Sequence, residues 1–264
     1  MALSFCSFSS GSSGNCYLIK SEDEAILVDA GISAKRILNG LKETDTDLGQ
    51  LTSLLITHEH SDHTKSVKTI LKQHKNVTAY ANEKTIEALG DSVDIDRVEN
   101  FENNKPFSIG NITIKPFKVS HDAVDPVGYS FYTKGKQISI VTDTGCIKDE
   151  ILKEIVDADL LVLEANHDVD MLRLSRYPRF LKERILSDKG HLSNELAGKA
   201  LLRLVSDKKK DRQVILAHLS KENNFPEMAY QTIKNILEEE EYYIGSDLEL
   251  NTVIRNQVSA VFQV

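Results

Sequence analysis

The densest concentration of metal-ligating side chains lies in one short run, Thr57-His58-Glu59-His60-Ser61-Asp62-His63. Neutral imidazoles and carboxylates hold divalent ions in proteins, and a catalytic site leaves one coordination position open for water. Three of the chain's 8 histidines fall in this run, with an aspartate beside the last of them. A chance cluster in a polar loop is the alternative, and the spacing makes it improbable. The run therefore predicts a metal site with hydrolytic chemistry.

The position of this run after a strand-like segment, residues 51–57, suggests how its side chains divide. Alternate residues of an extended chain point to the same side, so His58 and His60 can face one ion together. Asp62 and His63 enter a following helical stretch, point elsewhere and can take a second ion. Two ions about 3.5 to 4 Å apart can share a hydroxide and hold the attacking and leaving oxygens of a phosphodiester during hydrolysis.

The run resembles the H-x-H-x-D-H signature of the metallo-β-lactamase superfamily. The resemblance implies an α/β (α+β) fold, an αββα four-layer sandwich of two mixed β-sheets flanked by helices. It also implies three further ligands, each at the end of a strand and in a fixed order along the chain. A strand-end histidine or a turn aspartate would be ordinary alone, but the chain offers a candidate for each place in that order: His121, Asp143 and His218.

The resemblance also assigns each ligand to a metal. The assignment is His58, His60 and His121 for one ion, Asp62, His63 and His218 for the other, and Asp143 as the bridge. Asp62 is further expected to orient the attacking water, so that no separate general base is needed. Asp29, which follows a strand-like segment, matches the superfamily's early aspartate and is expected to orient the ligands. A turn aspartate before a glycine is the equally open alternative for Asp29.

Strand-like and helical segments alternate along the chain, and most candidate ligands stand where a strand-like segment ends. The strand candidates are residues 17–20, 25–28, 51–57, 77–80, 112–119, 128–132, 138–141, 160–163, 214–217 and 253–264. The helix candidates are residues 65–74, 83–89, 148–156, 194–205 and 227–240. This alternation favours mixed sheets inside and helices outside. Because no repeat or low-complexity linker marks a boundary, we expect residues 1–264 to form a single metallo-β-lactamase-like domain.

The composition is that of an ordinary globular protein, with 41% hydrophobic and 27% charged residues, and it excludes disordered and disulfide-rich classes. A formal charge of -8 argues against nonspecific nucleic-acid binding over the whole surface, without excluding a local positive patch. The amino terminus has no basic, apolar leader, and no later segment approaches the length of a membrane span. We therefore expect a cytoplasmic protein with no membrane partner.

A glutamate and a further histidine indicate a branch of the superfamily. The segments around Glu164, His191 and His218 resemble, in order, motifs of the superfamily's tRNA 3′-processing endonucleases. In those enzymes a glutamate and a histidine form a proton-donating dyad. The resemblance implies that Glu164 orients His191 and stabilises its protonated form, and that His191 protonates the leaving oxygen. A strand-end carboxylate and a histidine before a helix are the open alternative.

Over its whole length the chain resembles the YycJ (WalJ) family, from Ser9-Ser10-Gly11-Ser12-Ser13-Gly14-Asn15-Cys16 through Glu164-Ala165-Asn166-His167-Asp168 to the carboxy terminus. That family implies a 5′ to 3′ exodeoxyribonuclease with two divalent ions, linked to mismatch repair and to bacterial cell-wall regulatory operons. Nucleic acid is the expected partner, and the resemblance implies that it is DNA. Imidazole and carboxylate ligands suit zinc, manganese and iron alike. The residues themselves leave open the metal, DNA or RNA, strandedness, cleavage polarity and oligomeric state.

The stretch from Met171 to His191 is the one clearly basic part of the chain. It connects the two predicted dyad residues, so both of its ends should lie near the metals. We expect its arginines to hold the nucleic-acid backbone and Tyr177 or Phe180 to stack on a base, with a solvated helix face as the alternative. The candidate substrate contacts are Arg173, Arg176, Arg179, Arg184 and His167.

Two neighbouring features leave a choice open. His167 and Asp168 lie outside the ligand set and can contact a metal or a phosphate, although a polar loop is favoured. The serine- and glycine-rich run at residues 9–14 can cradle a phosphate through its backbone N–H groups, or can simply form a turn.

Other functions remain compatible with the ligand set. An RNA phosphodiesterase and a glyoxalase II-like thioesterase use similar ligands, although the predicted dyad and the basic stretch disfavour the thioesterase. The oxygen-reducing diiron branch carries glutamate in place of His60, and many β-lactamases carry cysteine in place of Asp143. A metal-binding partner of a signalling complex, without enzymatic activity, is the remaining alternative.

Overall fold

The computed structural model describes residues 3–264, which form two β-sheets packed face to face. The first sheet has the strand order β14 (Phe262–Gln263), β1 (Ser4–Ser9), β2 (Cys16–Lys20), β3 (Ala25–Val28), β4 (Leu51–Leu55), β5 (Thr78–Asn82) and β6 (Val98–Phe101). The second has the order β13 (Glu249–Thr252), β12 (Gln213–Ala217), β11 (Leu160–Glu164), β10 (Lys136–Val141), β9 (Val127–Thr133), β8 (Ile112–Lys118) and β7 (Phe107–Ile109).

The two sheets share one pattern of antiparallel and parallel strand pairing. In the first sheet β1, β2 and β3 pair antiparallel, and β3 to β6 pair parallel. In the second sheet β8, β9 and β10 pair antiparallel, and β10 to β13 pair parallel. Both sheets are therefore mixed, as predicted. The carboxyl ends of parallel strands meet at one edge of a sheet, which is where open α/β folds place their ligands.

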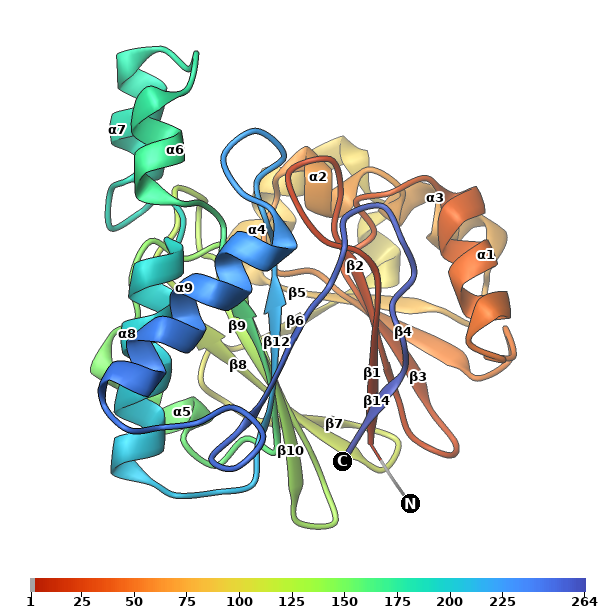
Figure 1. The fold of residues 1–264 in the computed structure, drawn as a ribbon. Helices are drawn as coiled ribbons and strands as arrows, with labels where there is room; N and C mark the ends of the chain where they lie inside the picture. The colour runs from red at the N-terminus through yellow and green to blue at the C-terminus, as the bar shows by residue number, and fades with distance from the viewer. Residues whose placement is uncertain (1–2) are drawn as a thin grey trace.

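Helices cover the outer face of each sheet and complete four layers (Figure 1). The helices that follow strands of the first sheet are α1 (Ala34–Glu43), α2 (Ser61–Thr64), α3 (Val67–Gln73) and α4 (Glu83–Leu89), with the 3₁₀ turns Gly90–Ser92 and Ile95–Arg97. Those that follow strands of the second are α5 (Asp149–Ile155), α6 (Val169–Leu174), α7 (Arg179–Ile185), α8 (Asn194–Asp207) and α9 (Pro226–Glu239). The predicted α/β four-layer sandwich is confirmed.

The alternation of side chains along β11 shows how the layers are held together. Leu160 and Val162 belong to the core between the two sheets, whereas Leu161 and Leu163 pack with apolar residues of α5, α8 and α9. A strand that is apolar at every position is expected where both faces of a sheet are covered. Burial on both sides thus fixes the register of β11 and the position of Glu164 at its carboxyl end.

Most predicted elements are present, and helix α4 has the predicted bounds. The predicted strand over residues 253–264 is wrong over most of its length, because within it only Phe262–Gln263 forms a strand. Asn256 has a left-handed φ of 59°, which breaks an extended run. Helix α1 was not predicted, although Ser33 caps it by accepting a hydrogen bond from the Arg36 N–H.

Helices α6 and α7 stand out from the second half of the molecule, between β11 and α8 (Figure 1). We call residues 169–185 the arm. Two of its large apolar side chains are exposed, Leu174 at 87% and Phe180 at 71%. Among residues 3–264, no helix is both long and apolar enough to span a membrane.

Candidate active site

Strand ends from both sheets converge at one edge of the sandwich and carry the predicted site residues. Asp29 follows β3 and the histidine-rich run follows β4. In the second sheet, Asp143 and His218 follow β10 and β12, and Glu164 ends β11. The structure brings the whole predicted ligand set together, although its members span positions 58 to 218.

The loop after β3 holds the histidine-rich run through backbone contacts. The Ala30 N–H donates to the His63 carbonyl at 2.8 Å, and the Asn15 N–H donates to the Asp62 carbonyl at 2.8 Å. A Cβ atom on Gly31 would lie 1.6 Å from that same Asp62 carbonyl oxygen. Only glycine permits this approach, so the Asp29-Ala30-Gly31 sequence sets the position of the run.

Asp29 is fully buried and orients the run, as the resemblance implied. Its Oδ1 accepts the Thr57 N–H at 2.9 Å, and its Oδ2 accepts the Thr57 hydroxyl at 2.8 Å. The same Oδ2 lies 2.7 Å from Nδ1 of His63. The proton on Nδ1 is therefore shared with Asp29, and Nε2 is the nitrogen left for a metal. Burial alone would lower the pKa of His63, but the carboxylates of Asp143 and Asp29 outweigh it and raise the pKa to about 10, so a metal at Nε2 must displace a proton.

Asn15 contacts His63, and the sequence did not predict this contact. Its Oδ1 accepts the Gly11 N–H at 2.8 Å, and its Nδ2 lies 2.9 Å from Nε2 of His63. The serine- and glycine-rich run thus supports the ligands. In the same run, Ser10 Oγ accepts the His218 backbone N–H at 2.7 Å.

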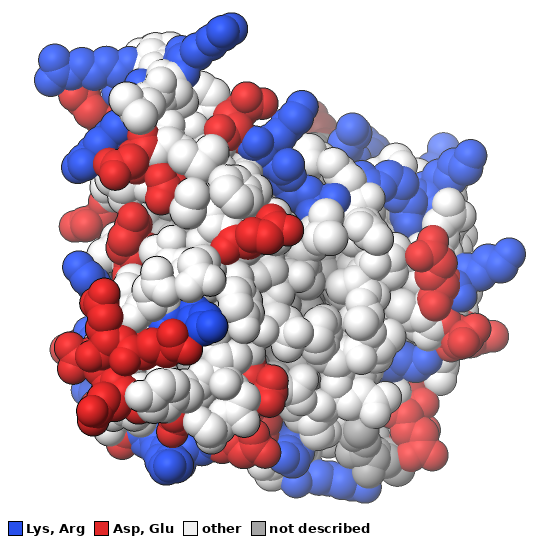
Figure 2. All heavy atoms as spheres, in the orientation of Figure 1, with Lys and Arg blue, Asp and Glu red and all other residues white. Residues whose placement is uncertain are grey.

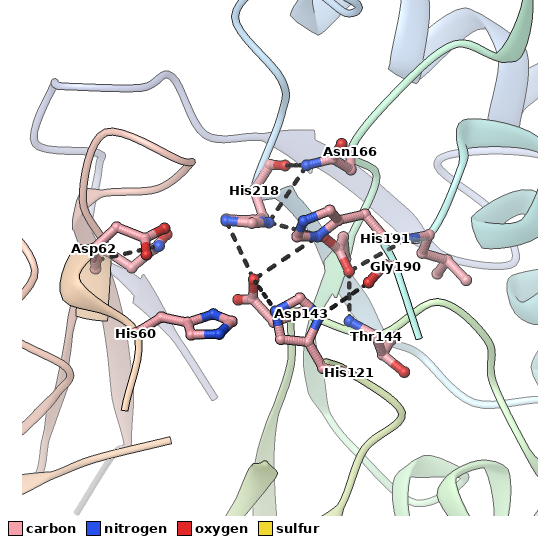
Figure 3. Close-up of polar contacts among 12 residues, drawn as sticks. His60, Asp62, His121, Asp143, Thr144, Asn166, Gly190, His191 and His218 are labelled. Atoms are coloured by element: carbon pink, nitrogen blue, oxygen red, sulfur yellow. Dashed lines mark hydrogen bonds and ion pairs between the residues drawn. The ribbon is translucent and has the colours of Figure 1, made fainter. Parts of the chain in front are cut away.

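Two groups of candidate ligand atoms match the predicted sets, each with all members within 4.8 Å of one another: His58, His60 and His121 in one, and Asp62, His63 and His218 in the other. Two further groups share members with these and contain Asp143, one with His58 and His63 and the other with Glu164, His191 and His218. Asp143 thus lies between the two predicted sets. Its Oδ2 is 3.4 Å from Nε2 of His63. Its Oδ1 is 3.6 Å from Nε2 of His218 (Figure 3). His121 contacts it from the other group, with 3.8 Å between Nε2 and Oδ1.

Two buried atoms of this cluster show that the residues fit a divalent cation. Within residues 3–264, neither Oδ2 of Asp143 nor Nε2 of His218 has a hydrogen-bond partner. A buried polar atom without a partner costs free energy, and a metal ion satisfies both atoms. Burial lowers the pKa of His58 well below its usual value, which keeps its imidazole neutral as a ligand must be.

Glu164 is fully buried and holds two histidines with one oxygen. Its Oε1 accepts from Nδ1 of His191 at 2.8 Å and from Nδ1 of His218 at 2.7 Å. Burial alone would raise the pKa of Glu164, but the charges and hydrogen bonds of these histidines outweigh it and lower the pKa to about 2. Both histidines therefore present Nε2 away from Glu164. The contact with His218 was not predicted from the sequence.

A cleft of about 330 Å³ opens beside this cluster. His60, Asp62 and His191 line it on the reaction side, and Tyr177 and Arg184 line it on the arm side. The Arg184 guanidinium is paired with Asp122, whose other oxygen is 3.3 Å from Nε2 of His121. Ser12 also lines the cleft and comes from the serine- and glycine-rich run that the sequence offered as a phosphate cradle. Asn166 and Ser220 line it too, and the sequence had not indicated them as site residues.

The remaining predicted substrate residues lie outside this cleft. Arg173 lines a separate cavity together with His167. Arg176 and Arg179 are exposed on the arm, and Arg179 pairs with Glu183. Asp168 is the N-cap of α6, where it accepts the Met171 N–H at 2.7 Å.

Comparison with known proteins places the chain in a family. Residues 24–219 match the family described as the beta-lactamase superfamily domain. The chain is 37% identical over 254 residues to the exodeoxyribonuclease YycJ of Bacillus anthracis, with 95% of each chain covered. It is 41% identical over 246 residues to the exodeoxyribonuclease WalJ of Streptococcus pneumoniae, with 91% of this chain and 90% of that one covered.

The chain belongs to the YycJ (WalJ) family of the metallo-β-lactamase superfamily. The fold of this family member also matches a solved structure, the metallo-beta-lactamase fold protein YhfI from Bacillus subtilis. The TM-score is 0.73 at 16% identity, with 100% of both chains covered. At that identity the match supports the fold alone.

Proposed function

We propose that this chain is a 5′ to 3′ exodeoxyribonuclease, a metal-dependent phosphodiesterase that acts in DNA repair in the cytoplasm. Relatives at 37% and 41% identity carry the name exodeoxyribonuclease. The observation that carries the proposal is the position of His191. Its Nδ1 is held by Glu164, and the imidazole lines the same cleft as the candidate ligand Asp62. A histidine held in this way is suited to donate a proton from Nε2.

The proposed cofactors are two divalent ions, zinc, manganese or iron. The ligands would be His58, His60 and His121 for one ion, Asp62, His63 and His218 for the other, and Asp143 for both. When bound, such ions neutralise charge on the phosphate and lower the pKa of the attacking water.

The protein's own groups would complete the hydrolysis. Asp62 is 30% exposed in the cleft, where it can orient the water that attacks phosphorus. As the new P–O bond forms and the P–O3′ bond breaks, His191 gives its proton to O3′, and the proton lost by the water restores the imidazolium. Glu164 stays ionised and stabilises that imidazolium. The products are a mononucleotide with a free 3′ hydroxyl and a DNA strand with a new 5′ phosphate.

The arm would hold the DNA backbone through Arg173, Arg176, Arg179 and Arg184. Figure 2 shows Lys and Arg side chains on the arm and along the upper edge of this face, with Asp and Glu side chains among them on the arm and more of them lower down on the left. Arg173 and Arg179 are 66% and 91% exposed in their pairs with Asp170 and Glu183. Exposed pairs of this kind contribute little, so phosphates can displace the carboxylates.

A second basic position lies across the cleft from the arm. Lys221 and Arg255 line a cavity that shares Ser12, Tyr177 and Ser220 with the cleft. The terminal nitrogen Nη1 of Arg255 has no hydrogen-bond partner within residues 3–264. Both sides of the cleft thus offer cations to a strand that passes over the ligand cluster.

The direct test is hydrolysis of 5′-end-labelled single- and double-stranded DNA with added manganese or zinc. The control is the double variant Asp62→Ala and His63→Ala. Release of labelled mononucleotides by the wild type alone is the expected result. Cleavage of RNA but not DNA would reassign the substrate, and no hydrolysis of either with any metal would overturn the proposal.

A further inference from the structure

A second cavity, of about 560 Å³, lies under the arm beside His191. It opens between the first turns of α6 and α8 and is within the size range of small-molecule sites. His191 lines both this cavity and the metal-side cleft. The lining side chains used below are His167, Val169, Arg173, Leu186, Glu195 and Leu196.

His167 is the most unusual residue of this cavity. It is 1% exposed, and neither ring nitrogen has a hydrogen-bond partner among residues 3–264. Its backbone is fixed, because its carbonyl accepts the Asn194 N–H at 2.9 Å and it forms a β-bridge with Ser193. Burial lowers the pKa of His167 to about 4, so the imidazole is neutral and offers one donor and one acceptor. A ligand that pairs with these atoms removes an energetic cost of the folded protein.

Glu195 adds a second group without a partner. Its Oε2 is buried and makes no hydrogen bond within residues 3–264. Asp170 also lines the cavity, and the one cation there, Arg173, lies 3.6 Å from Asp170. Two carboxylates beside one guanidinium make the cavity itself acidic, and they favour a neutral group that carries N–H donors.

The remaining walls are aliphatic. Val169 comes from α6, Leu186 follows α7 and Leu196 lies in the first turn of α8. Leu186 and Leu196 are 42% and 44% exposed, which is high for large apolar side chains next to a cavity. Aliphatic walls with a neutral imidazole and a carboxylate acceptor match the faces and the edge of a nucleobase.

We propose that this cavity binds the base of the 5′-terminal nucleotide, with Glu195 accepting from its exocyclic amino group and His167 pairing with its edge. The assignment of the terminal nucleotide rests on the proposed function, in which His191 protonates that nucleotide's O3′. Because His191 lines both cavities, the released nucleotide lies on the arm side of the cleavage point. Cytosine, adenine and guanine carry an exocyclic amino group and thymine does not, so thymine binds least well.

The test is equilibrium binding of the four deoxynucleoside 5′-monophosphates to the full metal-loaded chain, with Glu195→Gln as the variant. Glu227→Gln is the matched control, because Glu227 is also a glutamate in the first turn of a helix and is exposed. The wild type and the control should bind dCMP about tenfold more tightly than dTMP. Glu195→Gln should remove that preference, and His167→Asn should weaken all four ligands. Equal affinities in the wild type, or an unchanged preference in Glu195→Gln, would overturn the subsite.

A second readout separates the subsite from the proposed function. Hydrolysis of DNA strands that differ only in the 5′-terminal base should show the same preference in kcat/KM, lost in Glu195→Gln. DNA hydrolysis without any base preference would support the exonuclease activity and contradict the base subsite. The opposite outcome is also informative: the chain could hydrolyse no DNA and still show a dCMP preference that Glu195→Gln abolishes. That result would support the base site and contradict the exonuclease activity.

Discussion

The two sheets share one succession of strands but contribute to the site in different ways. The first sheet supplies four candidate ligands from one short run after β4. The second supplies three from the ends of β8, β10 and β12, together with the Glu164 and His191 pair. Ligands on one run keep their spacing through local backbone structure, whereas ligands on separate strands depend on packing of the whole sheet.

Two aspartates show the difference most clearly. Asp29 follows β3 and Asp143 follows β10, which are the third strands of the two equivalent successions. Both have a left-handed backbone, with φ of 61° and 54°. Both oxygens of Asp29 are satisfied by Thr57 and His63, whereas Oδ2 of Asp143 has no hydrogen-bond partner within residues 3–264. The same left-handed turn after the third strand therefore carries an aspartate that orients a ligand in the first half and an aspartate that is itself a candidate ligand in the second.

The largest effect is expected from Asp143→Asn, which removes the charge between the two ligand groups. DNA hydrolysis should fall about a thousandfold, equivalent to about 4 kcal/mol of transition-state stabilisation. Bound metal, measured by elemental analysis after dialysis, should fall with it. A variant that keeps both its metal content and its activity would show that Asp143 is not a ligand.

A smaller effect is expected from the matched variant Asp29→Asn. The amide oxygen can still accept one hydrogen bond, so His63 is oriented less firmly and metal affinity should fall about 10- to 100-fold. Competition with a chelator of known affinity measures this loss. A loss of metal and of activity equal to that in Asp143→Asn would contradict the difference assigned to the two aspartates.

The histidines of the two ligand groups should differ in proton release on metal binding. Burial lowers the pKa of His58, whereas at His63 and His218 burial is outweighed by neighbouring carboxylates, Asp143 first, which raise the pKa of His63 to about 10 and that of His218 to about 9. A ligand must be deprotonated, so below pH 9 both His63 and His218 lose a proton when metal binds. The apparent metal affinity should rise about a hundredfold per pH unit below pH 9 and about tenfold from pH 9 to pH 10, and then level off.

Metal titrations between pH 6.5 and 10 in weakly buffered solution check this pH dependence. His218→Ala keeps His63, so it should release about one proton instead of about two and should lose part of its metal binding. Release of no proton at pH 7 by the wild type would contradict the assigned difference between the two ligand groups.

The smallest effect is expected from charge reversal on the arm, which has no counterpart in the first half. Arg176→Glu with Arg179→Glu should weaken DNA binding about tenfold at low salt and reduce the salt dependence of binding. The control is Lys72→Glu with Lys75→Glu, at the connection from β4 to β5 in the first half. Fluorescence anisotropy over a range of salt concentrations measures both. Equal losses in the two variants would indicate a general charge effect and no DNA site on the arm.

The features that could be predicted from the sequence are those that depend on the pattern of neighbouring residues. The ligand run, the strand ends that carry Asp143 and His218, and helix α4 all follow from short-range spacing. The contact between Ser10 Oγ and the His218 N–H joins residues 208 positions apart, and no local pattern encodes it. The sharing of Glu164 by two histidines depends likewise on how β11 and β12 align in the sheet.

Other differences have a local cause. The arginines of the basic stretch separate because α6 and α7 project from the body, so that Arg184 lines the cleft while Arg176 and Arg179 do not. The strand predicted over residues 253–264 fails at Asn256, where the left-handed backbone turns the chain. Both differences arise from the direction of the backbone, which hydrophobic periodicity does not report.

The most direct measurement compares wild type and His191→Ala on DNA whose scissile O3′ is replaced by sulfur. A thiol has a pKa of about 8.5 and leaves as a thiolate without being protonated. On ordinary DNA, His191→Ala should lose about a hundredfold or more in rate while keeping its metal. On the sulfur-containing DNA it should hydrolyse at close to the wild-type rate. An equal loss on both substrates would contradict the role of His191 as the proton donor held by Glu164.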